Sequence, residues 1–439
     1  MGHNTSRSGY EKLVERLNKF PQGVPPSESL YQILKLLFSE EEAKLVSLLP
    51  IKPFTTKTAS KAWKKSFEET SEILNELASR ALLVDIEVDG NQTFSLPPPM
   101  AGFFEFSMMR IGGKIDQKVL GELFYQYMNV EDEFVTELMS LPTPIGRAFI
   151  NEESIEDKSI HVLDYERASE VIKTASHIGI GTCYCRHKKE HVGQNCDAPM
   201  EICMTFNATA SSLIKHGYAR QVDVDECMDL LEVAKEHNLV QFGDNVQNEV
   251  AFICNCCSCC CEALVAARKV GPTTAINTSN FICNIITDNC VGCSKCMEVC
   301  PVEAISMVSA NTPNSKTKIA QLEEDNCIGC GVCERVCKVD AIEMLPREKR
   351  VLTPVNMAHR VVMEAIETNK LQNLIFDNQA HFNHRAMASI LGAILKLPLV
   401  KQMMASEQVK SKYLLQSRNQ YLSIYKLQET KLLPNLNKK

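Results

Sequence analysis

Eight cysteines in the second half of the 439-residue chain form two runs with the spacing of a metal-cluster loop. The first run is Cys290-x2-Cys293-x2-Cys296-x3-Cys300, and the second is Cys327-x2-Cys330-x2-Cys333-x3-Cys337. Zinc sites favour paired C-x2-C halves, whereas four cysteines at this spacing are typical of [4Fe–4S] clusters. The spacing therefore predicts two such clusters, and the chemistry that they predict is the transfer of single electrons.

Each cluster needs four thiolates, and a tight loop can present only three before the chain leaves in a helix. The fourth ligand is therefore expected from the other run. One cluster would take Cys290, Cys293, Cys296 and Cys337. The other would take Cys327, Cys330, Cys333 and Cys300.

The residues around the two runs also repeat, with a period of 37 residues. Asp288-Asn289-Cys290-Val291-Gly292-Cys293 is echoed by Asp325-Asn326-Cys327-Ile328-Gly329-Cys330, and the tails Val302–Met307 and Val339–Met344 are both predicted to be short apolar strands. On these motifs, residues 284–346 resemble the bacterial-type two-cluster ferredoxin domain. The resemblance implies a small α+β fold with pseudo-twofold symmetry and two clusters close enough to exchange electrons. One departure is that Lys338 follows the second run where Pro301 follows the first.

Twelve further cysteines lie between residues 183 and 283, more than a protein core requires. Ten of them are candidate ligands of an additional Fe–S cluster or of zinc: Cys183, Cys185, Cys196, Cys203, Cys254, Cys256, Cys257, Cys259, Cys260 and Cys261. The adjacent cysteines 256 and 257 should point in opposite directions along an extended chain, so they would divide between two sites or bridge a cluster of another shape.

Three interpretations of this region stay open. It could hold a third Fe–S cluster, or a structural zinc site in which Cys196 and Cys203 join Cys183 and Cys185. It could also be catalytic, because basic residues beside these cysteines would lower thiol pKa values and could receive an anionic substrate. Those basic residues are Arg186, His187, Lys188, Lys189 and His191.

The N-terminal region is predicted to be helical and then to form a hairpin. Helices are expected near 27–37, 43–49 and 67–81, and strands at 82–88 and 93–96 around a turn at 89–91. This order resembles a winged-helix domain. In DNA-binding members the third helix carries basic or amide side chains, but here it carries Glu68, Glu69, Glu72 and Glu76 against Arg80. Lys57, Lys61, Lys64 and Lys65 come just before that helix. The acidic helix would repel phosphates, so protein docking is favoured over DNA binding.

The remaining segments show no catalytic grouping. The aromatic residues Phe103, Phe104 and Phe106 are expected in a core. The apolar segment 386–395 is too short to cross a bilayer and is expected to be a buried or docking helix. The last forty residues, rich in Lys and Arg, are expected to form a mobile or partner-bound tail.

The fold class expected is α+β multidomain, with a winged-helix-like domain, a cysteine-rich α/β region, a ferredoxin-like 2x[4Fe-4S] domain and a helical C-terminus. The expected boundaries are 1–26, 27–100, 101–176 (a helical connector), 177–283, 284–346 and 347–439. The formal net charge of −7 does not favour binding to nucleic acid or to an anionic membrane. Twenty cysteines without a signal peptide or a long apolar span predict a reducing compartment, the cytoplasm.

The sequence as a whole is similar to large cysteine-rich iron–sulfur proteins of anaerobic metabolism. The first hypothesis is an electron-transfer protein that carries two [4Fe–4S] clusters and exchanges electrons with redox protein partners, alone or as a subunit of a larger complex. The first alternative is an oxidoreductase, or its subunit, with its own active centre or third cluster in the cysteine-rich region. The second is an Fe–S redox sensor that binds DNA. A self-sufficient enzyme is the less favoured form.

Overall fold

The computed structural model describes residues 8–88, 91–110, 112, 115–155, 164–271, 276–310, 318–351, 353–378 and 380–396. These residues form helices and several separate β-sheets, in agreement with the expected mixed α and β content. They divide into two compact units. Unit 1 contains the described residues within 8–26, 34–107 and 356–396, and unit 2 those within 27–33 and 108–355. This division is coarser than the six expected segments, whose boundaries remain predictions.

The N-terminal part of the chain forms five helices within residues 8–79. They are α1 (Gly9–Leu17), α2 (Glu28–Leu37), α3 (Glu40–Val46), α4 (Thr56–Trp63) and α5 (Phe67–Ser79). Ser39 caps α3, and its backbone N–H donates to the Glu42 carboxylate, which closes a capping box. Helix α4 was not expected from the sequence. It begins with a hydrogen bond from the Thr58 N–H to the Thr55 side chain and ends at Lys64, whose φ of 57° is left-handed.

Three strands of the same part of the chain form an antiparallel sheet. Its strands are β1 (Phe54–Thr55), β2 (Val84–Val88) and β3 (Asn91–Ser95), in the order β1-β3-β2. Residues 89–90 of the expected turn lie outside the described residues. In the hairpin Val84 pairs with Ser95 and Val88 with Asn91, so the return strand begins at Asn91, which was expected in the turn.

The remaining parts of unit 1 are helical. After η1 (Pro99–Phe103), helix α6 (Phe104–Met108) runs to the boundary of the unit, and the three expected core aromatics at 103, 104 and 106 are buried. The C-terminal helices are α17 (Met357–Glu367), α18 (Leu371–Ile375) and α19 (Phe382–Leu395). No helix in the described residues is long and apolar enough to span a membrane. The expected tail at 400–439 lies outside the described residues.

Unit 2 contains a six-stranded antiparallel sheet in the order β4-β8-β9-β6-β5-β7. The strands are β4 (Gly146–Ala148), β5 (Ile178–Thr182), β6 (Glu201–Phe206), β7 (Arg220–Gln221), β8 (Val240–Asp244) and β9 (Phe252–Cys256). The helices are α7 (Gln117–Tyr125), η2 (Gln126–Val130), α8 (Glu133–Met139), η4 (Asp164–Glu166), α9 (Ala168–Thr174), α10 (Tyr184–His191), α11 (Asn207–Lys215), α12 (Val224–Glu236) and α13 (Glu262–Val270). Apolar residues of β5, β6 and β9 pack against residues of α9 and α12 in one core.

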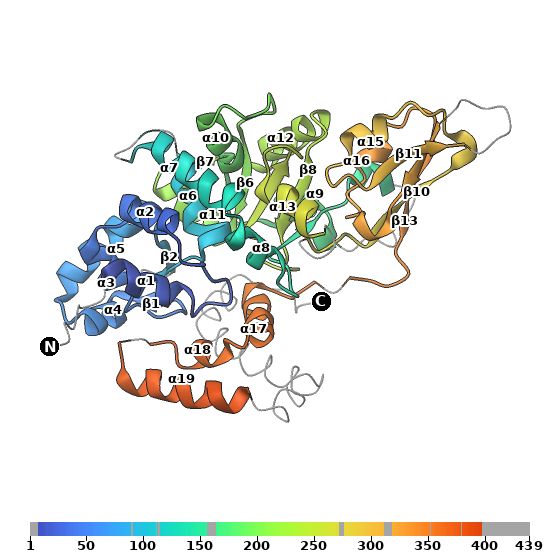
Figure 1. Ribbon diagram of the computed structural model, residues 1–439. Helices are drawn as coiled ribbons and strands as arrows, with labels where there is room; N and C mark the ends of the chain where they lie inside the picture. The colour runs from blue at the N-terminus through green and yellow to red at the C-terminus, as the bar shows by residue number, and fades with distance from the viewer. Residues whose placement is uncertain are drawn as a thin grey trace, which may run out of the picture. The chain divides into compact units, whose positions relative to one another are not determined.

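The rest of unit 2 is the double-loop segment, which we define as the described residues within 281–346. It contains β10 (Phe281–Ile285), η5 (Thr287–Asn289), α15 (Lys295–Val299), β11 (Ile305–Ser309), β12 (Lys318–Leu322), η6 (Glu324–Asn326), α16 (Val332–Arg335) and β13 (Ile342–Pro346). These elements lie together in Figure 1. The strand before each cysteine run pairs antiparallel with the strand after the other run, β10 with β13 and β12 with β11. This crossed pairing brings the end of each run back toward the other.

Candidate metal centres

The two cysteine loops of the double-loop segment have the same backbone conformation. Each run begins directly after a one-turn 3-10 helix, turns at a glycine and continues into a short helix. The turn glycines Gly292 and Gly329 both have φ +71°. A Cβ at Gly292 would lie 2.2 Å from the Lys318 carbonyl oxygen, and one at Gly329 would lie 2.1 Å from the Phe281 carbonyl oxygen. Glycine is therefore required at both turns by conformation and by space.

Four cysteines drawn from both runs line a single pocket, with apolar side chains around them. They are Cys300, Cys327, Cys330 and Cys333, and their pocket neighbours include Val302, Ile305, Ile328 and Met344. This set is the one expected for one cluster, and the pocket's sulfur-rich, apolar lining fits a [4Fe–4S] group. A fifth cysteine, Cys283 of β10, also lines the pocket, and its side chain interacts with that of Cys333.

The other expected set lies nearer the surface. Cys290 and Cys337 are half-buried, Cys296 is buried and Cys293 is exposed. Cys290 acts electrostatically on Cys296, and so does Cys333 from the other set. The two loops are thus near enough for a charge on one to be felt on the other.

Burial makes ionised thiols costly in both loops. It raises the pKa of Cys296 to about 11 and raises the pKa of Cys330 well above its ordinary value. Three sulfurs accept hydrogen bonds from backbone N–H groups: Cys300 from Ala304 at 3.2 Å, Cys337 from Ala341 at 3.3 Å, and Cys290 from Ala320 at 3.4 Å. A bound cation would supply the remaining stabilisation, because metal ligation requires thiolates.

The ten candidate cysteines of the second region gather around one part of the six-stranded sheet. Strand alternation places Ile253 of β9 in the apolar core, so Cys254 and Cys256 lie on the opposite face. The Sγ atom of Cys203 on the neighbouring strand β6 is 3.9 Å from that of Cys254.

Six of these cysteines form what we call the thiol chain, a series in which each side chain interacts with the next. The order is Cys203, Cys254, Cys256, Cys261, Cys185 and Cys183. Cys183 and Cys261 are the N-cap residues of α10 and α13. The pKa of Cys183 is lowered by its interaction with Cys185 and by the Arg186 guanidinium, and the pKa of Cys261 is lowered by interactions with Cys185 and Cys256. The pKa of Cys185, which interacts with both of these thiols, is raised by Cys183 and Cys261.

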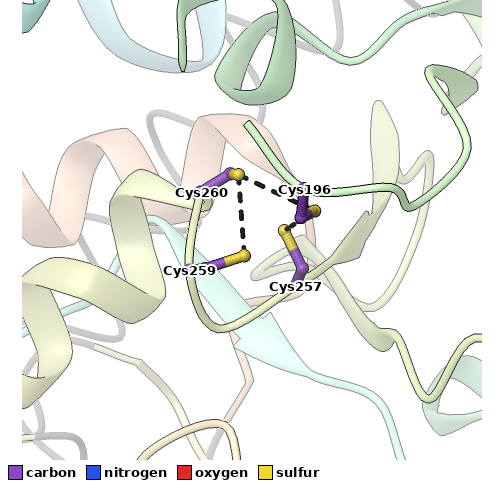
Figure 2. Close-up of side chains that lie close together, drawn as sticks. All are labelled: Cys196, Cys257, Cys259 and Cys260. Atoms are coloured by element: carbon purple, nitrogen blue, oxygen red, sulfur yellow. Dashed lines mark hydrogen bonds between the residues drawn. The ribbon is translucent and has the colours of Figure 1, made fainter. Parts of the chain in front are cut away.

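The other four cysteines form what we call the four-thiol group: Cys196, Cys257, Cys259 and Cys260. All four Sγ atoms lie within 4.8 Å of one another, and Figure 2 shows the side chains converging from two segments. The Cys196 sulfur is 3.6 Å from that of Cys257 and 3.8 Å from that of Cys260, and the Cys259 and Cys260 sulfurs are 3.6 Å apart.

These thiols compete for ionisation. The interaction with Cys260, aided by the Arg186 guanidinium, lowers the pKa of Cys257 to about 5, and the same interaction raises the pKa of Cys260. Burial raises the pKa of Cys259 to about 11. The structure thus separates the adjacent cysteines 256 and 257 into different groups. It also places Cys196 with Cys257, Cys259 and Cys260, a different set from the one expected for zinc.

The Arg186 side chain lies between the two groups of thiols and is completely buried. Its guanidinium donates to the Pro199 carbonyl at 2.9 Å and to the Asn255 carbonyl at 2.8 Å, and it also interacts with the Cys196 sulfur. Cys183, Cys256 and Cys257 act on it electrostatically. Within the described residues its counter-charges are therefore sulfurs.

His187, Lys188 and Lys189 of α10 are also buried and His191 is half-buried, so these residues do not form an open, solvent-exposed anion site. The Lys188 ammonium pairs with Glu262 and donates to Asn129 Oδ1 at 2.5 Å. Lys189 donates to Gln194 Oε1 at 3.1 Å, and the Nε2 atoms of His187 and His191 are 3.1 Å apart. This arrangement weakens the catalytic interpretation that depended on binding an anionic substrate.

Helix α13 connects the thiol chain to the double-loop segment. Its N-cap residue is Cys261, and in its last turn Arg268 donates to the Pro301 carbonyl at 2.9 Å and pairs with Glu303 at 3.3 Å. The helical rise separates Cys261 and Arg268 by about 10 Å along the axis. Sequence reasoning did not identify this link.

Sequence reasoning also missed Cys283, although the pattern Phe281-Ile282-Cys283 preceding the first run was a signal that a strand delivers it to a cluster. Cys227, by contrast, is buried in the apolar core at α12 and belongs to neither group.

Comparison with known protein families gives one match. The family model described as a 4Fe-4S dicluster domain matches residues 289–341, which contain both cysteine runs. No curated protein matches the chain. The match supports an iron–sulfur protein, and the matched residues lie within the double-loop segment.

Proposed function

We propose that the protein transfers single electrons through two [4Fe–4S] clusters held by the double-loop segment. One cluster would be held by Cys300, Cys327, Cys330 and Cys333, and the other by Cys290, Cys293, Cys296 and Cys337. The observation that carries the proposal is that one cysteine of the first run and three of the second line the same pocket. When bound, each cluster supplies a site that gains and loses one electron at a time.

The surface of the first loop supports docking of a redox partner there. Cys293 is exposed, and the adjacent apolar side chains Val291 and Met297 are 58% and 38% exposed. The other set lines the pocket, and its Cys333 acts electrostatically on Cys296 of the exposed loop. An electron could therefore enter or leave at the exposed loop and be held in the more buried one. The donor and acceptor would be redox proteins, in a complex or encountered transiently.

A second candidate function is an oxidoreductase whose active centre lies in the thiol chain. The observation that favours it is the run of six interacting thiols that α13 connects to Pro301 of the double-loop segment. A third Fe–S centre there would extend the electron path away from the dicluster domain. Turnover of a thiol, disulfide or other redox substrate by the purified protein would distinguish this function from simple electron transfer.

Residues 27–100 are proposed to be a winged-helix-like domain that docks proteins. Its strand order β1-β3-β2 and the position of α5 before the hairpin support this. The four glutamates of α5 are exposed, which disfavours contact with the DNA backbone. We propose a cytoplasmic location and a place in anaerobic metabolism, because both conditions keep thiols and clusters reduced.

The experiment that tests the proposed function compares Cys300→Ser with Cys227→Ala. Proteins purified without oxygen are assayed for iron and acid-labile sulfide, and dithionite-reduced samples are examined by low-temperature EPR. The intact chain should show two magnetically interacting [4Fe–4S] signals. Cys300→Ser should lose one cluster's share of iron and sulfide together with the interaction, while Cys227→Ala keeps both. A chain that holds no sulfide, or that keeps both signals without Cys300, contradicts the proposal.

A further inference from the structure

We infer that the four-thiol group binds a single tetrahedral divalent metal ion of the zinc class, apart from any Fe–S cluster. The ligands would be Cys196, Cys257, Cys259 and Cys260. This site goes beyond the proposed electron transfer and does not depend on it.

The sulfur spacing favours one ion over a cluster. A metal with four Zn–S bonds of about 2.3 Å has sulfur–sulfur edges of about 3.8 Å in a regular tetrahedron. The three measured separations are 3.6, 3.6 and 3.8 Å, and every pair lies within 4.8 Å. A [4Fe–4S] cube holds its thiolates further apart, because each one is bound outside a different corner of the cube.

The ligands come from two segments that the ion would join. Cys257, Cys259 and Cys260 lie in the turn between β9 and α13, and Cys196 lies in the loop between α10 and β6. Four protein ligands leave no open coordination position, which is the arrangement of structural zinc sites. The ion would thus fasten the turn before α13 to the loop after α10.

The buried cation beside the group supports thiolate charge at this site. A divalent ion with four thiolates carries a net charge of −2, and the Arg186 guanidinium interacts with Cys196 and acts on Cys257. A completely buried guanidinium needs a counter-charge, and within the described residues the structure gives it sulfurs and two backbone carbonyls. A centre with four thiolates around a divalent ion provides a counter-charge of −2, more than the single Cys257 thiolate of the metal-free group.

The test measures metals and sulfide on the full chain purified without oxygen. The inference expects one metal ion per chain beyond the iron that is matched by acid-labile sulfide. The variants Cys196→Ala and Cys260→Ala should each lose that one ion and no sulfide, and Cys227→Ala should lose neither. Elemental analysis identifies the ion as zinc or as iron without sulfide. Loss of iron and sulfide in equal amounts from either variant means that the group holds a cluster, and retention of all metal means that it holds none; both results overturn the inference.

A measurement on the unaltered protein covers the case in which the variants do not fold. X-ray absorption at the zinc edge should show four sulfurs at about 2.3 Å and no neighbouring metal; if the extra ion is iron, Mössbauer spectra should show one mononuclear iron with four sulfur ligands beside the cluster iron. Nitrogen or oxygen ligands, or a nearby metal atom, would overturn the inference. The EPR signals of the dicluster domain, recorded on the same samples, report separately on the proposed electron-transfer function.

Discussion

Replacing Gly329 by alanine should destabilise the second cysteine loop much more than the addition of a single methyl group suggests. The residue has φ +71°, a conformation that costs an L-residue about 1–2 kcal/mol. The added Cβ would also lie 2.1 Å from the Phe281 carbonyl oxygen and 2.3 Å from Ser279 Oγ. Because the first of these is a backbone atom of β10, relief requires the loop or the strand to move, which adds about 1–3 kcal/mol.

Gly217 offers a matched control. Its φ is +74°, but a Cβ there would have no atom within 4 Å. Gly217→Ala therefore carries the conformational cost alone. The free energies of unfolding of the two variants should differ by about 1–3 kcal/mol. At about 2–4 °C per kcal/mol, their thermal midpoints should differ by roughly 2–12 °C.

Differential scanning calorimetry of both variants, at one scan rate and without oxygen, measures this difference. Iron and sulfide assays on the same samples show whether the displaced loop still holds its cluster, since the turn sets the positions of Cys327 and Cys330. Equal midpoints and full iron content in both variants would refute the reasoning, because the Phe281 contact would then have no cost.

Three further predictions concern thiols and charge in unit 2. Cys283→Ala removes the thiol that interacts with Cys333, so the reduction potential of one cluster should become more negative in a voltammetric titration while iron content is unchanged. In metal-stripped protein at pH 7, Cys257 should be alkylated faster than Cys227 in peptide mass mapping, because their pKa values are about 5 and about 12; the Cys257 rate should fall as the pH drops through 5. Glu262→Gln leaves the buried Lys188 of α10 without its counter-charge, so calorimetry should show that the free energy of unfolding falls by about 3–5 kcal/mol.

Each of these predictions has a control. Cys283→Ser keeps a hydrogen-bond donor and should retain most of the original potential; an unchanged potential in the alanine variant contradicts the role of the thiol. Equal alkylation of the two cysteines would mean that Cys257 is not a thiolate in the metal-free chain. For the ion pair, Glu170→Gln removes the partner of the exposed Lys173 and should cost less than about 1 kcal/mol.

The helical and strand pattern of the chain was largely predictable from local sequence. The N-terminal hairpin and the helix before it were expected, and so were the strands after each cysteine run, which the structure places two or three residues further along. Helix α4 was missed because its eight residues include two threonines and two lysines and bury only a few side chains, among them Ala59 and Trp63. A short helix of this kind is held by tertiary packing more than by its own propensity.

The sequence by itself indicated iron–sulfur chemistry for the double-loop segment, because the spacing within each run decides which thiols one loop can present. It also indicated that Cys256 and Cys257 would either divide between two sites or bridge a cluster of another shape, since neighbouring side chains on a strand point to opposite faces. Only the tertiary structure decided the partners of the other cysteines. Cys196 meets Cys257 across 61 residues, and Arg186 reaches the Asn255 carbonyl across 69, because the antiparallel neighbours β6 and β9 bring the chain back to the same place. Such long-range pairings depend on sheet order, and no local pattern in the sequence encodes that order.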